Sequence, residues 1–128
     1  MMGMEFRVII AGGRDFNDYE MLKEKCDHML SKKKDTHKVI IVSGHAAGAD
    51  ALGERYAKER GFLLETYPAE WEKYGKSAGP KRNHRMAEVA NALVAFWDGK
   101  SKGTKNMIDL ANMKGIPVKI VRIDEGKS

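Results

Sequence analysis

Five short apolar runs alternate with stretches of helical periodicity along this chain of 128 residues. Runs such as 39–42 do not alternate with polar residues, which is typical of strands buried on both faces of a parallel sheet. Right-handed crossovers through the intervening helices then predict an α/β fold, a three-layer sandwich with a mainly parallel five-stranded sheet. The predicted strands cover residues 6–11, 38–43, 63–67, 92–97 and 118–121.

Four helices are predicted between these strands. Asn17 is the expected N-cap of the first helix, and Thr104 is the expected N-cap of the fourth. The third helix carries Arg82, Met86 and Val89 on one stripe, which we expect to run toward the core. Each strand is therefore joined to the next by a helix, as a parallel sheet requires.

Length and composition indicate a single soluble domain over residues 1–128. No apolar run is long enough to cross a bilayer, so we expect no membrane partner. The start lacks the pattern of a signal peptide and Cys26 is the only cysteine, which favours a cytoplasmic protein. Residues 71–128 carry 12 basic and 6 acidic groups, against 11 and 12 in residues 1–70. This basic half favours anionic partners, although a lysine-rich surface is often only solvated.

The unusual residues of the chain concentrate where the predicted strands end. The four strand-to-helix junctions are 12–15, 44–50, 68–82 and 98–104. Ligands of parallel α/β sheets bind outside the carboxyl ends of the strands. The sequence therefore predicts a binding site at this edge of the sheet.

The first two junctions are rich in small residues. Gly12 and Gly13 let the backbone approach a ligand, and Arg14 is suited to pair with a phosphate. The dinucleotide fingerprint G-x-G-x-x-G is absent. The second junction opens a helix, whose N-terminus suits a phosphate or carboxylate, with Asp50 as a cap or an acceptor for ribose hydroxyls. A loop histidine such as His45 is more often solvated than catalytic.

Positive charge gathers at the third junction. Residues 68–80 lack periodicity, and a loop of this length in a compact domain is usually functional. We expect Arg82 to lie along the edge of the sheet, with Lys76 nearby, at a helix N-terminus that favours an anion. Trp71 and Tyr74 in the same loop are candidates for stacking on a base.

The fourth junction is a glycine-rich turn at residues 98–104. A P-loop needs glycine five residues before its Gly-Lys pair, and this chain has Val94 there, so that match fails. The turn still presents backbone N–H groups to an anion. The four histidines and single cysteine lack zinc spacing, and no Gly-x-Ser-x-Gly elbow is present. We therefore expect neither a metal nor a cofactor.

In their spaced order, these junctions resemble the SLOG superfamily, named for the Smf/DprA and LOG proteins, and within it the YspA/cpYpsA-related branch of bacteria and phages. The matching residues are 12–16, 43–44 with 48–50, 68–71 with 74–76, 78–80 with 82–83 and 86, and 96–99 with 102–104. The resemblance implies a Rossmann-like fold that binds a nucleotide or nucleotide-derived ligand. Members include phosphoribohydrolases, sensors of nucleotide signals and the single-strand-binding DprA.

Two departures from the superfamily pattern bear on activity. The second junction reads Gly-His-Ala-Ala from Gly44, where relatives commonly have another glycine and then a basic residue. The fourth lacks the Pro-Gly-Gly-x-Gly-Thr-x-x-Glu form of the phosphoribohydrolases, with no matching glutamate after Thr104. We therefore favour a domain that binds or senses a nucleotide over an enzyme that cleaves an N-glycosidic bond. In that enzyme, Asp50 or Asp98 would stabilise positive charge on the ribose.

A nucleic-acid-binding module is a third alternative, made less favoured by the lack of a basic stripe interleaved with aromatic residues. The expected partner is a nucleotide-like small molecule, and self-association is compatible with the sequence. The predicted catalytic residues of the enzymatic alternative are Asp50 and Asp98. The predicted ligand-binding residues are Gly12, Gly13, Arg14, Asp15, Gly44, Gly48, Asp50, Lys76, Gly79, Arg82, Asn83, Gly99, Lys102, Gly103 and Thr104.

Overall fold

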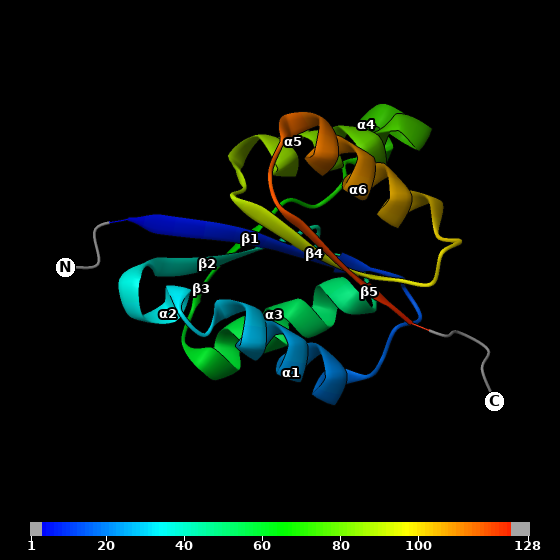
Figure 1. Cartoon of the computed structure of the whole chain (residues 1–128). Coiled ribbons are helices and arrows are strands. Elements are labelled where there is room, and N and C mark those ends of the chain that lie inside the picture. Colours follow the sequence, from blue (N-terminus) through cyan, green and yellow to red (C-terminus); the bar gives the residue numbers. More distant parts are fainter. Residues whose placement is uncertain (1–3, 124–128) are drawn as a thin grey trace.

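The computed structural model describes residues 4–123 and contains the predicted five-stranded parallel sheet. Its strands, β1 (Glu5–Gly12), β2 (Lys38–Ser43), β3 (Leu63–Thr66), β4 (Ala92–Trp97) and β5 (Val118–Arg122), lie in the order β3-β2-β1-β4-β5. Every neighbouring pair is parallel (Figure 1). The predicted α/β class, parallel sheet and strand positions are therefore confirmed.

The main helices cover the two faces of this sheet and complete a three-layer sandwich. Figure 1 shows α1 (Tyr19–Leu30) and α3 (Ala49–Arg60) on one face, and α5 (Ala78–Val89) and α6 (Lys102–Lys114) on the other. The shorter elements α2 (Lys33–Thr36), α4 (Trp71–Tyr74) and the 3₁₀ turn η1 (Gly75–Ser77) lie outside the predicted helices. Within the described range, no helix is long and apolar enough to cross a membrane.

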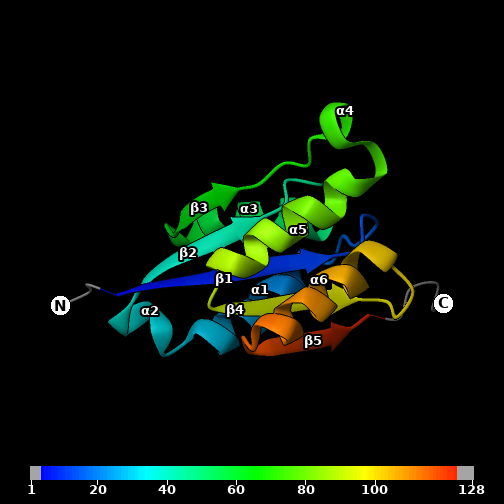
Figure 2. The same cartoon turned by 90° about the horizontal axis from the view of Figure 1, so that it is seen from above.

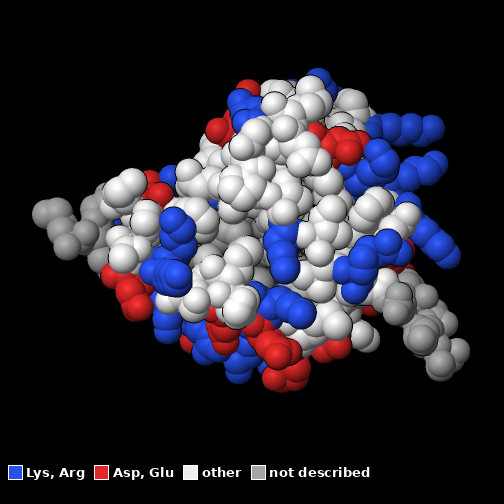
Figure 3. Space-filling model, in the orientation of Figure 1, with Lys and Arg blue, Asp and Glu red and all other residues white. Residues whose placement is uncertain are grey.

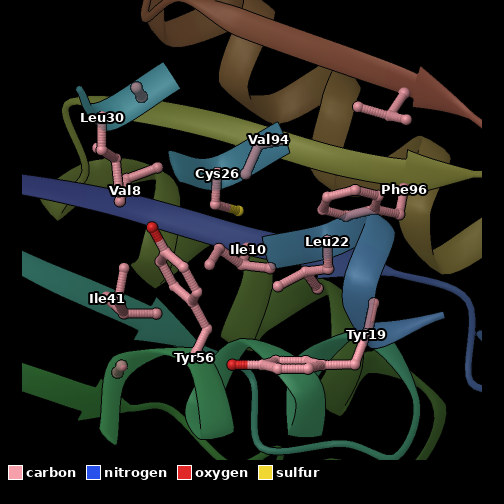
Figure 4. Packing of buried hydrophobic residues seen from close by; sticks show 14 of the residues in the cluster. Val8, Ile10, Tyr19, Leu22, Cys26, Leu30, Ile41, Tyr56, Val94 and Phe96 are labelled. Atoms are coloured by element: carbon pink, nitrogen blue, oxygen red, sulfur yellow. The ribbon is translucent and has the colours of Figure 1, made fainter. Parts of the chain in front are cut away.

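Two apolar clusters hold the layers together, one on each face of the sheet. Figure 4 shows the larger one, in which Leu22 and Cys26 of α1 and Tyr56 of α3 pack against β1 and β4. The ring of Phe16 stacks on that of Phe96 with centroids 5.1 Å apart, which fixes the loop after β1 against the end of β4. Burial of this kind on both faces explains why the strands read as continuous apolar runs.

Three details of the predicted helices were wrong. The N-cap of α1 is Asp18, not Asn17, and its carboxylate accepts a hydrogen bond from the Met21 amide. The N-cap of α6 is Ser101, because the helix already begins at Lys102 and Thr104 is buried within its first turn. Val89 is 40% exposed, because the buried stripe of α5 runs through Asn83, Met86 and Ala87 instead.

The strand order of the sheet has a switch point between β1 and β4, on either side of which the chain moves outward in opposite directions. From β1 it moves outward to β2 and β3, and then crosses back to β4 and β5 (Figure 2). Gly12 ends β1 at this switch point, where a Cβ would lie 2.5 Å from the Phe96 carbonyl oxygen and 2.7 Å from the Ala49 Cβ. A topological switch point is where a doubly wound sheet opens a crevice for ligands.

Gly48 provides a test of how tightly the loops pack at this edge. Its φ of +77° and the overlap of a Cβ with the carbonyl oxygens of Gly13 and Arg14 both demand glycine. We expect Gly48→Ala to lower the free energy of unfolding by at least about 2 kcal/mol. Gly13→Ala is the matched control, because a Cβ there meets no atom within 4 Å. That variant should change stability by less than about 1 kcal/mol. Equal losses in urea unfolding would contradict the close approach of the two loops.

Candidate functional site

A cleft of about 950 Å³ opens at the carboxyl edge of the sheet, beside the switch point between β1 and β4. All four junctions contribute to its walls, the second through Ala46 and Asp50. Its predicted lining residues are Gly12, Gly13, Arg14, Asp15, Asp50, Gly79, Arg82, Asn83, Asp98, Lys102, Gly103 and Thr104. The structure thus brings most of the predicted site together.

The loop after β1 forms the floor of the cleft and is fixed by backbone contacts. The carbonyl of Gly13 accepts hydrogen bonds from the amides of Ala49, at 3.1 Å, and Phe16, at 3.3 Å. The Gly13 amide donates to the carbonyl of Phe96 on the neighbouring strand. These contacts leave the exposed side chain of Arg14 in the cleft wall.

Arg82 connects the second junction with the third. Its Nη1 donates to the Gly44 carbonyl at 2.5 Å, and its Nε donates to Asn83 Oδ1 at 2.8 Å. No carboxylate of the described chain lies within salt-bridge distance of it. Burial lowers the pKa of the Arg82 guanidinium, while the nearby charge of Asp50 raises it and that of Arg14 lowers it. Arg82 is therefore a half-buried cation whose charge the protein compensates only in part.

Asn83 joins this arrangement to the fourth junction. Its side chain is buried, and its Nδ2 donates to Asn106 Oδ1 on α6 at 2.9 Å. The side chains of Arg82, Asn83 and Asn106 therefore form one continuous hydrogen-bonded wall. Asn106 lies one helical turn beyond Gly103, so its side chain reaches the same cleft.

Asp50 lies in the first turn of α3 and is only 8% exposed. Burial raises its pKa to about 6, against the opposing effects of a hydrogen bond from the Ala46 amide and the charge of Arg82. The amide of Ala46 donates to Oδ2 at 3.2 Å, so Asp50 closes the loop that precedes its helix. A carboxyl group that titrates near neutral pH in a cleft is suited to proton transfer.

Asp98 has a clear role in the fourth loop. Its Oδ1 accepts hydrogen bonds from the amides of Lys100 and Ser101, both at 2.8 Å. These two bonds lower the pKa of the carboxyl group. Asp98 therefore stays ionised and shapes the turn that leads into α6, while it also lines the cleft.

His45 belongs to a separate cluster outside the cleft lining. Its Nδ1 lies 2.8 Å from Glu54 Oε2, which also accepts a hydrogen bond from Ser43 Oγ at 2.8 Å. The His45 amide donates back to Ser43 Oγ at 3.0 Å. These contacts hold the residue at a φ of +61°, so they fix the shape of the second loop.

Four predicted residues lie outside the lining of the cleft: Gly44, Gly48, Lys76 and Gly99. A Cβ at Gly44 would lie 2.5 Å from Arg82 Nη1, and a Cβ at Gly48 would overlap the backbone of the first loop. Lys76 is exposed on η1. Conversely, the predicted ligand-binding residues did not include Asn106, which lines the cleft, or Trp71, which also lines it and had been considered only for stacking on a base. For Trp71 the signal was its aromatic side chain in a long loop, whereas Asn106 could be found only by its spacing from Gly103.

Several cationic side chains project from this end of the molecule. Figure 3 shows Lys and Arg side chains projecting from the right-hand side, toward which the strands run in Figure 1. Within residues 4–123, no three His, Cys, Asp or Glu side chains gather in a way that could hold a metal ion. The lining of the cleft itself holds four cationic side chains, Arg14, Arg82, Lys102 and Arg122, beside the four aspartates Asp15, Asp18, Asp50 and Asp98.

Comparison with known proteins agrees with this geometry. The sequence profile of the YspA, cpYpsA-related SLOG family matches residues 6–74. The "Gene 61 protein" of Mycobacterium phage D29 is 34% identical over 118 residues, which cover 88% of this chain and 93% of the phage protein. The chain therefore has a Rossmann-like domain of the SLOG superfamily and belongs to the YspA, cpYpsA-related SLOG family.

Two solved structures share the fold. One is DNA processing protein A (DprA) from Streptococcus pneumoniae, with a TM-score of 0.66 and 16% identity over 91% of this chain. The chain spans 50% of the length of that protein. The other is TM1055, with a TM-score of 0.63 and 20% sequence identity. The match covers 90% of this chain and 72% of the TM1055 chain. These likenesses show the fold, and the family match confirms the resemblance to the SLOG superfamily expected from the sequence.

The pH dependence of stability tests the environment of Asp50. The pKa of Asp50 is raised from 3.8 to about 6 in the folded state, so the folded protein holds this proton more tightly than the unfolded chain does. The contribution of Asp50 to the free energy of unfolding is therefore complete below pH 4 and is lost as the pH rises through about 6. We expect the stability of the protein relative to Asp50→Asn to fall by about 3 kcal/mol between pH 4 and pH 8. Urea unfolding of both proteins across this range measures the difference. Parallel pH profiles would show that Asp50 ionises as a solvated carboxyl group does.

Proposed function

We propose that the cleft binds a phosphate-bearing nucleotide and that the protein acts as a sensor or processor of this ligand. The observation that carries the proposal is Arg82, a half-buried guanidinium held by a carbonyl and an amide oxygen. Among residues 4–123, no carboxylate lies within salt-bridge distance of it. An arginine in this state favours a bound anion, and its planar fork matches the oxygens of a phosphate. Arg14 adds a second guanidinium to the same cleft.

The surroundings of Arg82 support a nucleotide over a bare phosphate. The helices α3 and α5 begin at this edge with no side-chain cap, which favours negative charge near their N-termini. The cleft volume of about 950 Å³ accommodates a ligand larger than phosphate. Trp71, half of which is exposed, offers a ring on which a base can stack. Membership of a SLOG family supports the same class of ligand.

A second candidate function is hydrolysis of the N-glycosidic bond of the bound nucleotide. The observation in its favour is Asp50, whose pKa of about 6 suits a group that exchanges protons at neutral pH. Asp98 is less suited to proton transfer, because two backbone amides already occupy one of its oxygens. The sequence has no glutamate after Thr104 that matches the phosphoribohydrolase pattern. Lys105, the next residue, pairs with Asp109 on the exposed side of α6.

Substitution of Arg82 tests the binding proposal. We expect Arg82→Ala to weaken binding of nucleoside 5′-monophosphates about ten- to a hundredfold, because hydrogen bonds to charged groups contribute about 1.5–3 kcal/mol. Arg82→Lys should also weaken binding, since an ammonium group cannot replace the fork. Arg55→Ala, an exposed arginine of α3 outside the cleft lining, is the control and should bind as the parent protein does.

Calorimetric titration with AMP, GMP, CMP and UMP, beside melting curves of each variant, measures these effects. Intact affinity together with a lower melting temperature for Arg82→Ala would show that Arg82 only clamps the loops. No binding of any nucleotide to the parent protein at millimolar concentration would contradict the proposal itself.

Chromatography of the same mixtures tests hydrolysis. If the protein cleaves the bond, free base and ribose 5-phosphate should accumulate in equal amounts, and Asp50→Asn should lower the rate at least about a hundredfold. Asp98→Asn should retain more activity, because an amide oxygen can still accept from the two backbone amides. Base release at the same rate by the parent protein and Asp50→Asn would exclude Asp50 as the catalytic acid or base.

A further inference from the structure

A second depression adjoins the cleft, and we call it the α4–α5 groove. It has a volume of about 560 Å³ and is lined by residues of the segment before α4, of α4 itself, of α5 and of α6. Pro80, Arg82 and Asn106 line both the groove and the cleft. Figure 2 shows α4 next to the N-terminal end of α5. Arg82 therefore stands at the boundary of two adjoining cavities.

The α4–α5 groove is cationic. Lys81 and Arg85 line it, and within the described part of the chain neither has a carboxylate at salt-bridge distance. Each cation instead lies over an aromatic ring: Lys81 Nζ is 5.0 Å from the centre of the Tyr74 ring. Arg85 Cζ is 5.6 Å from the centre of the Tyr67 ring. The one carboxylate in the lining is Glu70.

The single turn of α4 supplies one aromatic side chain to each cavity. Trp71 lines the cleft and is 50% exposed, whereas Tyr74 lines the groove and is 37% exposed. Exposed rings beside cations are the surface that successive bases of a nucleic-acid strand stack on, and such stacking tolerates any base. Each ring thus lines one of the two cavities that share Arg82.

We propose that the α4–α5 groove is a second nucleotide subsite, so that the ligand contains two nucleotides joined by a phosphodiester whose linking phosphate lies at Arg82. The inference rests on the proposed function, because it takes the cleft as the first subsite. A free dinucleotide and the end of a longer single strand both offer this chemistry. A second nucleotide in the groove would contact Lys81 and Arg85, the two cations that a mononucleotide in the cleft does not reach.

Titration with thymidine 5′-monophosphate, the dinucleotide pTpT and a ten-residue oligothymidylate tests the second subsite. We expect pTpT to bind about tenfold more tightly than the monophosphate. That gain is the size expected when one additional base stacks on an aromatic side chain. Binding of the oligonucleotide at least as tight as that of pTpT would identify a single strand as the source, and weaker binding would identify a free dinucleotide. Equal affinities for pTpT and the monophosphate would overturn the inference while leaving the proposed function intact.

Variants of the groove separate its contribution from that of the cleft. Tyr74→Leu should abolish the advantage of pTpT and leave the affinity for the monophosphate unchanged, and Tyr74→Phe, which keeps the ring, should retain that advantage. Glu70→Gln should increase the advantage, because it removes the negative charge from the groove. Circular dichroism confirms that each variant is folded. If Tyr74→Leu weakens both ligands equally, the inference is wrong, and if neither ligand binds the parent protein, the proposed function fails with it.

Discussion

The candidate site depends on one partly buried interaction, the hydrogen bond from the Arg82 guanidinium to the carbonyl of Gly44. Through it the start of α5 is tied to the loop after β2, and through Asn83 the same wall continues to α6. A carbonyl oxygen satisfies a donor without cancelling the charge, so the cation remains only partly compensated by Asp50. The same contact that holds the loops together thus leaves a partly compensated guanidinium in the wall of the cleft.

The parallel sheet makes this arrangement possible. Every strand ends at the same edge, and the switch between β1 and β4 leaves room there for a cleft. Glycines let the loops come close: Gly12 lies against Phe96 and Ala49, and Gly48 lies against the first loop. The backbone therefore forms a rigid floor, and the charged side chains of α3 and α5 rise from it.

The sheet and its junctions could be predicted from the sequence because continuous apolar runs and glycine-rich turns are local signals. Contacts between elements have no such signal. Asn106 reaches the cleft only because α6 packs beside α5, and α4 is a single turn without a periodic stripe. The sequence also lacks a contiguous basic and aromatic stripe, yet the fold assembles Tyr67, Tyr74, Lys81 and Arg85 from three separate segments. Gly48, which was expected to contact a ligand, lies outside the cleft lining and packs closely against the first loop.

The central claim is that Arg82 binds the phosphate of a nucleotide. Its most direct test is the crystal structure of the protein with a bound nucleoside 5′-monophosphate. The account predicts the phosphate within hydrogen-bond distance of the Arg82 guanidinium, with Arg14 beside it and the base against Trp71. A nucleotide bound elsewhere, with Arg82 still contacting only Gly44 and Asn83, would contradict the account.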